Sequence, residues 1–326
     1  MHAIEARGLT KTYPGDVRAL DGLSFSVEEG TVFGLLGPNG AGKSTAVKIL
    51  TTLSHPDSGE ASVGGFDVLG EPARVRKAIG VVGQHSGLDH EATGRENLKL
   101  QGQLHDLGGR ALDRRVDELM EQFGLADAAG RLVREYSGGM QRRLDIALAL
   151  VHHPRVLFLD EPTTGLDPEV RAEMWKEIER LTGEGLTVLL TTHYMDEADH
   201  LASALAIVDS GRIVAEGTPD ELKRELRGDA IHVELEGSVD GDVRAALERL
   251  DAVREVVVNG QAVHARADDG ARTVPTVLAA LDAGGFPVAS VTVARPSLDD
   301  VYLRYTGRTF SAAEAESEQT TKEEDR

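Results

Sequence analysis

The chain has 326 residues, with 55 acidic and 35 basic side chains, a formal net charge of −20 and no cysteine. This length allows one large α/β domain and a smaller one, and the acidic balance disfavours a broad nucleic-acid-binding surface. Without cysteine there are neither disulfides nor thiolate metal sites. Residues 1–11 lack the apolar core of a signal peptide, and no apolar run approaches the roughly 20 residues of a membrane span. We therefore expect a soluble chain, or one that reaches a membrane only through a partner.

The chain opens with two expected strands, Ile4–Leu9 and Ala19–Val27, on either side of a turn at Pro14-Gly15. Tyr13 lies in that turn. An aromatic ring just upstream of a nucleotide loop can stack on adenine. Its position alone does not distinguish that role from the role of an ordinary surface tyrosine.

The next stretch, Gly37–Thr45, has the spacing of a phosphate-binding loop. A short apolar strand precedes it, and residues 46–50 predict the first turns of a helix whose N-terminus would face an anion. Small residues let successive backbone N–H groups point at phosphates. Lys43 can then reach the β- and γ-phosphates, and Ser44 can help to hold Mg²⁺. The loop consists of Gly37, Pro38, Asn39, Gly40, Ala41, Gly42, Lys43, Ser44 and Thr45.

Beyond a turn cluster at residues 55–59 we expect an edge strand over Glu60–Val68 and a β-branched strand over Ile79–Val82, which ends at Gly83-Gln84. Gln84 is an ordinary polar loop residue unless that strand end faces the phosphates, where it could have a role at the nucleotide. From Glu91 to about Arg134, leucines and other apolar residues recur at helical spacing, which predicts a helical insert.

Two further motifs follow in the chain. Ser137 can cap a helix whose first N–H groups are left open by Gly138 and Gly139, which makes either a second anion site or a common turn. The apolar run at residues 156–159 predicts a buried strand that ends at Asp160-Glu161. Carboxylates at such a place suit an Mg²⁺ shell (Asp160) and a water to be oriented or deprotonated (Glu161). Solvated turn acids are the alternative, and the apolar residues directly before them disfavour it.

Pro168 is placed at a helix start, and Glu169–Leu181 predicts an amphipathic helix. Leu186–Leu190 predicts another buried strand, with His193 just beyond its end. A lone histidine is usually structural, but one next to the Asp160 strand could donate to a γ-phosphate. Residues 205–214 predict a hairpin.

The pattern changes after Gly228. Strands and helices follow in the order βαββαβ, with an Asn259-Gly260 hairpin turn, which is the order of a small ferredoxin-like domain. We predict a regulatory or dimerisation role for this part. Residues 308–326 are acidic and polar and predict a disordered tail. The expected domains are therefore residues 1–227 (with the helical insert at about 91–150), 228–307 and the tail 308–326.

Over residues 4–226 the chain resembles the ATP-binding cassette (ABC) ATPases, whose motifs occur here in the family's order. They are the phosphate loop, Gln84, the signature Ser137-Gly138-Gly139, the strand ending Asp160-Glu161, Asp167 of the D-loop and His193. The signature directly before the Asp-Glu strand separates this family from other phosphate-loop ATPases. The resemblance implies an α/β phosphate-loop ATPase fold, with a mixed sheet and a helical subdomain, ahead of the ferredoxin-like α+β domain.

The resemblance also implies residue roles. Tyr13 would stack on adenine. The phosphate loop would hold ATP, with Ser44, Asp160 and Gln84 serving Mg²⁺. Gln84 would also sense the γ-phosphate and move the insert. Glu161 would polarise the attacking water, His193 would stabilise the γ-phosphate, and Ser137 and Gly139 would contact the ATP of an opposite subunit, with Gly138 and Asp167 counted in the same site.

Two positions depart from the family pattern: Tyr136 stands for the usual Leu and Met140 for the usual Gln. We expect packing differences there and retained activity. The C-terminal half, including residues 297–302, looks like the extension of daunorubicin-resistance-type drug exporter ATPases.

We therefore expect an ATPase subunit that forms a homodimer on ATP and Mg²⁺ and drives export through a separate polytopic membrane permease at the cytoplasmic face of the cell membrane, without nucleic acid. The docking surface would lie between the helical insert and the Gln84 loop. The alternatives are a soluble ABC ATPase that acts on nucleic acid or ribosomes, and an ATP-gated switch with a small effector.

Overall fold

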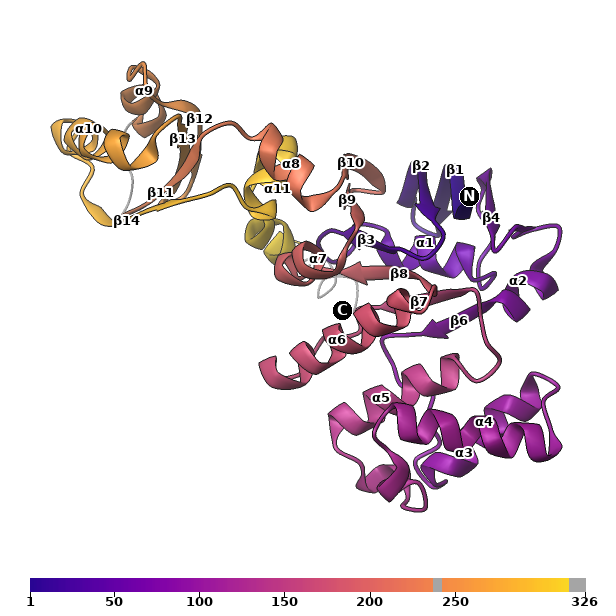
Figure 1. Cartoon of the computed structure of the whole chain (residues 1–326). Helices are drawn as coiled ribbons and strands as arrows, with labels where there is room; N and C mark the ends of the chain where they lie inside the picture. The colour runs from indigo at the N-terminus through magenta and orange to yellow at the C-terminus, as the bar shows by residue number, and fades with distance from the viewer. Residues whose placement is uncertain (237–241, 317–326) are drawn as a thin grey trace. The chain divides into compact units, whose positions relative to one another are not determined.

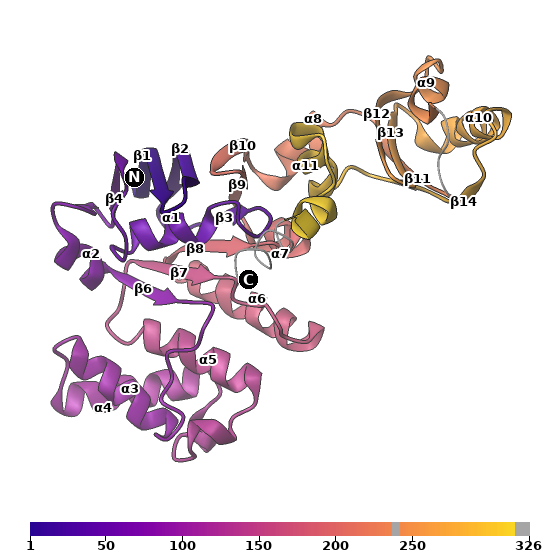
Figure 2. The same cartoon turned by 180° about the vertical axis from the view of Figure 1, so that it is seen from behind.

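The computed structural model describes residues 1–236 and 242–316, and the chain divides into two units, Met1–Ile213 and Val214–Arg326 (Figures 1 and 2). Each unit has its own apolar core. Within the described ranges, none of the helices combines the length and apolar character needed to cross a bilayer.

The first unit begins with an antiparallel sheet of strand order β2-β1-β4-β5. Its strands are β1 (His2–Tyr13), β2 (Val17–Glu28), β4 (Ser58–Val63) and β5 (Phe66–Asp67). The predicted turn joins β1 to β2, and Gly15 (φ 85°) supplies the left-handed backbone that it requires. The expected edge strand is in fact two shorter strands, because the chain turns at Gly64-Gly65.

The second sheet has six strands and carries the predicted loops at the carboxyl edge of its parallel part. Its order is β10-β9-β3-β8-β7-β6, and the four pairings among β9, β3, β8, β7 and β6 are parallel. The strands are β3 (Val32–Leu36), β6 (Ile79–Val82), β7 (Val156–Asp160), β8 (Thr187–Thr192) and β9 (Ala204–Asp209). Because Leu36 pairs with Thr192 and Asp160 with Thr191, the ends of β3, β8 and β7 lie level.

The two faces of the parallel sheet are covered by different helices. Along β7, Val156 and Phe158 pack into a core shared with α1 (Lys43–Leu50) and α2 (Pro72–Ala78). Leu157 and Leu159 pack into a second core with α5 (Gly138–Ala149) and α6 (Pro168–Gly183). Since side chains alternate along a strand, α1 and α5 lie on opposite faces of the sheet.

The predicted helical insert is present. It contains α3 (Gly94–Leu104), α4 (Gly109–Gln122), the short 3₁₀ turns Ala126–Ala128 and Val133–Glu135, and α5. Thr93 and Glu96 form a capping box at the start of α3. The buried Tyr136 donates its hydroxyl to the carbonyl oxygen of Ala128 at 2.7 Å. A Cβ at Gly94 would lie 2.4 Å from that hydroxyl, so the tyrosine at the start of the signature is accommodated by a glycine.

Two short helices were absent from our predictions: α2 and α7 (Met195–Leu201), each of seven residues. The glutamate and tyrosine at their N-caps make no side-chain capping bond, so both helices lack the usual capping residue, although α2 begins with Pro72. Along the chain, β10 (Arg212–Gly217) leads from the first unit into the second.

The second unit confirms the βαββαβ order. After α8 (Pro219–Glu225) come β11 (Asp229–Leu235), α9 (Val243–Glu248), β12 (Arg254–Asn259), β13 (Ala262–Ala267), α10 (Gly270–Ala283) and β14 (Val288–Ala294). The sheet order is β12-β13-β11-β14, with antiparallel pairings throughout. The predicted Asn259-Gly260 turn joins β12 to β13. Helix α11 (Leu298–Thr306) follows, with a capping box made by Ser297 and Asp300.

The disordered tail was predicted to begin at residue 308, and its first part is instead ordered. Residues 310–316 are helical, with Phe310 and Ala313 buried and the Phe310 ring against Tyr302 at 5.1 Å between centroids. These two apolar residues anchor a segment that its composition alone marks as polar. Residues 317–326 lie outside the described part of the chain.

Candidate nucleotide-binding site

The phosphate loop runs from the end of β3 to the start of α1. Its glycines are required by close backbone packing: a Cβ at Gly37 would lie 2.2 Å from the carbonyl oxygen of Val208, and one at Gly42 (φ 105°) 2.3 Å from that of Ala19. Lys43 is buried and donates to the carbonyl oxygens of Gly37 at 2.6 Å and Pro38 at 3.0 Å. The loop therefore folds around its own lysine.

Asp160 is held at the end of β7 by two hydroxyl groups. Ser44 donates to its Oδ1 at 3.3 Å, and Thr191 at the end of β8 donates to the same oxygen at 2.5 Å. The phosphate loop and the end of the Asp160 strand are therefore in contact. Carboxylate and hydroxyl oxygens are ligands that Mg²⁺ prefers, and these two side chains fit such an ion.

Glu161 lies between the ammonium group of Lys43 and the imidazole ring of His193. Its Oε1 is 3.8 Å from the Nζ of Lys43 and 3.4 Å from the Nδ1 of His193. Burial acts to raise the pKa of this carboxyl, but the His193 hydrogen bond and the charge of Lys43 outweigh it, so the pKa lies below its usual value. Glu161 is therefore ionised at neutral pH and able to accept a proton.

The backbone of Glu161 adopts φ 48°, which is uncommon for a residue with a side chain. Its N–H donates to both the carbonyl oxygen and the hydroxyl of Thr191, each at 3.1 Å. Thr191 therefore fixes both acids at once, through the side chain of Asp160 and the main chain of Glu161. We did not predict a role for Thr191. Its position, one residue before the end of the strand next to β7, was the only sequence signal for one.

A buried carboxylate, Glu197 on α7, supports the segment after Glu161. It accepts from the hydroxyl of Thr163 at 2.8 Å and from the indole N–H of Trp175 at 3.2 Å. Arg142 on α5 is also buried, and donates to the carbonyl oxygens of Pro162 at 2.8 Å and Gly83 at 2.9 Å. We predicted a role for neither residue, because their partners are distant in the chain.

The remaining predicted residues lie on other elements. Ser137 caps α5 by accepting from the Met140 N–H at 3.3 Å, and a Cβ on Gly139 would lie 2.9 Å from Val170 of α6. Helix α5 lies across the sheet from α1, which follows the phosphate loop. Asp167 caps α6 by accepting from the N–H groups of residues 169 and 170.

Gln84 and Tyr13 are the last two site residues predicted from the sequence. Gln84 is exposed in the loop after β6, one strand beyond β7, and Gly83 before it is the residue that Arg142 ties to Pro162. Tyr13 is the last residue of β1, with the Nζ of Lys11 5.8 Å from its ring centroid. Its role in stacking on adenine stays a prediction.

Comparison with known proteins gives the family. Residues 20–164 match the family model "ABC transporter", and residues 217–306 match "ATP-binding protein DrrA1-3-like, C-terminal domain". The daunorubicin resistance ATP-binding protein DrrA3 of Streptomyces coeruleorubidus is 50% identical over 306 residues, which are 94% of this chain and 96% of that protein. The chain belongs to the DrrA type of ABC transporter ATP-binding proteins. The daunorubicin/doxorubicin resistance ATP-binding protein DrrA of Streptomyces peucetius is 46% identical over 327 residues, 99% of this chain and 97% of that protein.

Solved structures agree with this membership. An ATP-binding subunit of an ABC transporter superposes with a TM-score of 0.62 at 28% identity, over 68% of this chain and 92% of its own. A dimeric ATP-binding cassette bound to ADP and phosphate gives 0.60 at 26% identity, over 66% and 98%. This DrrA-type subunit therefore binds ATP and hydrolyses it in a cycle coupled to transport, and the predicted fold class is confirmed.

Proposed function

We propose that two copies of this chain close around two ATP molecules and power export of a drug or another hydrophobic small molecule through a separate membrane permease. The observation that carries the proposal is the convergence of Lys43, Glu161 and His193 at one edge of the parallel sheet. The resistance named for the relatives supports a drug as cargo. On this proposal the chain works at the cytoplasmic face of the membrane.

In the proposed reaction, Lys43 and the loop N–H groups neutralise and orient the phosphates. Glu161 accepts a proton from the water that attacks the γ-phosphorus. The bond between that phosphorus and the β–γ bridging oxygen breaks, which leaves ADP and phosphate. His193 lies 3.4 Å from Glu161, and we assign it to hold the carboxylate and the γ-phosphate in place.

Mg²⁺ is part of the proposal. Ser44 and Asp160 would hold it, with Gln84 as a further oxygen ligand. When bound, the ion would neutralise charge on the β- and γ-phosphates.

The proposed dimer follows from the position of the signature. Residues 137–139 open α5 on the face of the sheet opposite α1, so a phosphate loop would need these residues from a second copy. Glu161→Gln should form a dimer on ATP in analytical ultracentrifugation, while the ATPase rate per wild-type chain should rise with protein concentration. Glu173→Gln, an exposed acid on α6, is the matched control. Full activity from a strict monomer at every concentration would overturn this proposal.

A groove between the helical insert and the Gln84 loop supports permease docking there. Its volume is about 410 Å³, and it is lined by Leu53, Val81, Gly83, Gln101 and His152 among others. Leu53 is 74% exposed. Leu53→Glu should abolish co-purification with a polytopic membrane permease from the native cells, while Leu69→Glu, at a leucine that is 48% exposed and outside the groove, should not. Equal capture of both variants would place the docking surface elsewhere.

A further inference from the structure

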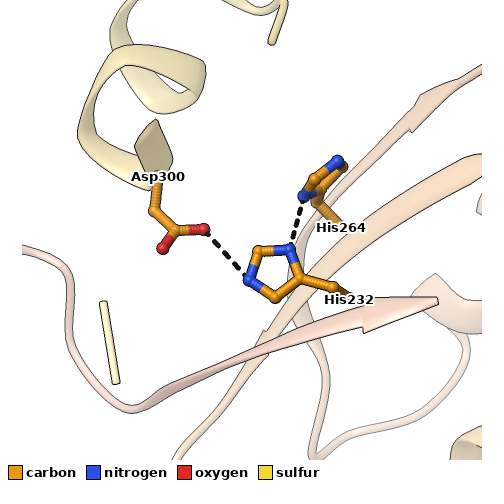
Figure 3. Close-up of side chains that lie close together, drawn as sticks. All are labelled: His232, His264 and Asp300. Carbon is orange, nitrogen blue, oxygen red and sulfur yellow. Dashed lines mark hydrogen bonds and ion pairs between the residues drawn. The ribbon is translucent and has the colours of Figure 1, made fainter. Parts of the chain in front are cut away.

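Three side chains of the second unit, none of them part of the nucleotide site, converge (Figure 3). His232 on β11 and His264 on β13 are direct cross-strand partners, and their Nδ1 atoms are 2.8 Å apart. Asp300 on α11 directs its Oδ1 at the Nε2 of His232, at 3.6 Å. Two strands and a helix thus supply one group each.

These side chains project from the face of the sheet opposite its apolar core. Their chain neighbours Ile231, Val233, Val263 and Ala265 all belong to the core that packs against α9 and α10. Because side chains alternate along a strand, the two histidines face the other way, toward α11. The antiparallel register fixes them as neighbours, so their meeting is built into the fold.

Asp300 is held in place by its own helix. It is 8% exposed, and its Oδ2 accepts from the N–H and the hydroxyl of Ser297, both at 2.8 Å. Carboxylates that ligate a metal are commonly oriented by such hydrogen bonds. The nearby Arg266 has other partners: its Nη2 donates to the carbonyl oxygens of Arg227 and Gly228, and its Nε is 3.5 Å from Glu255.

We propose that His232, His264 and Asp300 form a binding site for a divalent transition metal ion, with Zn²⁺ as the best match. Two imidazoles and one carboxylate are a ligand set that Zn²⁺ takes in proteins, whereas Mg²⁺ and Ca²⁺ prefer oxygen alone. One ligand atom from each residue lies within 4.8 Å of the other two. Zn²⁺ bonds of about 2.0–2.2 Å in a tetrahedron set ligand atoms about 3.4 Å apart, so small side-chain rotations complete the site.

Two further observations support a metal site: the three residues line a cavity, and they form a ligand cluster without a second example among the described residues. All three residues line one cavity of about 940 Å³, which gives an ion an entry path and leaves space for water as a fourth ligand. Within residues 1–236 and 242–316, this is the one cluster of three such ligands. The bound ion would tie α11 to the sheet and brace the second unit.

The test is titration of the untagged full chain with Zn²⁺ by calorimetry, and with Co²⁺ followed by its visible absorption, without nucleotide. We expect about one equivalent to bind and to raise the unfolding temperature. His264→Gln and Asp300→Asn should each weaken binding by about tenfold or more. His105→Gln is the matched control, because His105 also pairs with a histidine, His152, and lies outside the cluster.

Binding that is absent from the wild-type chain overturns the site. Binding that persists unchanged in His264→Gln and Asp300→Asn also overturns it, and would point to another group such as Glu161 with His193. Circular dichroism reports whether each variant is folded. If His264→Gln does not fold, Asp300→Asn decides, because asparagine still accepts the Ser297 hydrogen bonds.

Discussion

The Nζ of Lys43 lies 3.8 Å from the Oε1 of Glu161, and both side chains are largely buried, at 4% and 9% exposed. This pair joins the phosphate loop to the end of β7 and links phosphate binding to proton transfer. Substitutions of the two residues should nevertheless affect different steps, ATP binding for Lys43 and ATP hydrolysis for Glu161. Lys43→Ala should abolish tight ATP binding. Glu161→Gln should still bind ATP and should lower the hydrolysis rate by about 10²–10⁴-fold, which is the rate factor that a positioned general base typically contributes.

Fluorescent-nucleotide binding and phosphate release measure the two effects separately. Glu173→Gln serves again as control. Glu161 is not the proton acceptor if its glutamine variant turns over ATP at the wild-type rate, and tight binding by Lys43→Ala would place the phosphates elsewhere.

Arg142 should act as a positioning residue for the loops after β6 and β7. Its guanidinium joins the carbonyl oxygens of Gly83 and Pro162, next to Gln84 and Glu161. Arg142→Ala removes both bonds, so we expect the unfolding free energy to fall by about 1–3 kcal/mol and kcat to fall while KM for ATP changes little. Arg142→Lys should restore kcat only in part, because an ammonium does not reproduce the guanidinium fork.

Urea unfolding and steady-state kinetics check this prediction, with the exposed Arg110→Ala as control. A loss of stability with unchanged kcat in the folded protein would show that Arg142 is structural only.

The site residues that belong to local sequence motifs could be predicted from the sequence. Each of these motifs directly follows an apolar run that reads as a buried strand: the glycine loop, the two acids and the histidine. Parallel strands end at the same edge of a sheet, so these residues could be expected to lie near one another. Thr191, Arg142 and Glu197 could not be found in this way. Their roles come from partners 20 to 59 residues away, as in the bonds from Arg142 to Pro162 and to Gly83.

The same limit applied to the fold. Strands with apolar runs were predicted, as were helices with a helical period, a capping residue or a phosphate loop before them, whereas α2 and α7 are seven residues long and have no capping side chain. The helix at residues 310–316 depends on the burial of Phe310 and Ala313, a tertiary effect that a polar composition conceals.

Glu197 should make the protein less stable as pH rises. Burial raises the pKa of this carboxyl above 4.5, against the hydrogen bonds from Thr192, Thr163 and Trp175. The folded state therefore holds its proton more tightly than the unfolded state, so this stabilisation is complete below pH 4.5 and is lost as pH rises through the folded-state pKa. Glu197→Gln is neutral at every pH and its amide oxygen can accept the same bonds.

We expect Glu197→Gln to unfold at a higher temperature than the wild-type chain at about pH 8, with the difference shrinking toward about pH 5. Calorimetric melts of both proteins, with Glu173→Gln as control, measure this. A glutamine variant that is less stable at both pH values would show that the charged carboxylate is needed.

His152 should make the protein less stable as the pH falls, which is the opposite pH dependence to that of Glu197. Burial, then the charge of the neighbouring His105, lower its pKa from 6.5 to about 4, although its hydrogen bond with the Ile79 carbonyl oxygen opposes the shift. The two rings stack with 3.7 Å between centroids. The folded state resists protonation of His152, so its stabilisation is present above pH 6.5 and is lost as pH falls toward 4.

His152→Gln keeps a donor for the Ile79 carbonyl oxygen and removes the titration. It should be less stable than the wild-type chain at neutral pH, because the ring stack is lost, and the difference should narrow as pH falls from 6.5 toward 4. Urea unfolding across this range measures it, and the exposed His55→Gln should follow the wild-type curve. A constant gap between His152→Gln and wild type would show that His152 does not titrate there. Because His152 lines the groove assigned to the permease, its protonation would also place a positive charge at that surface.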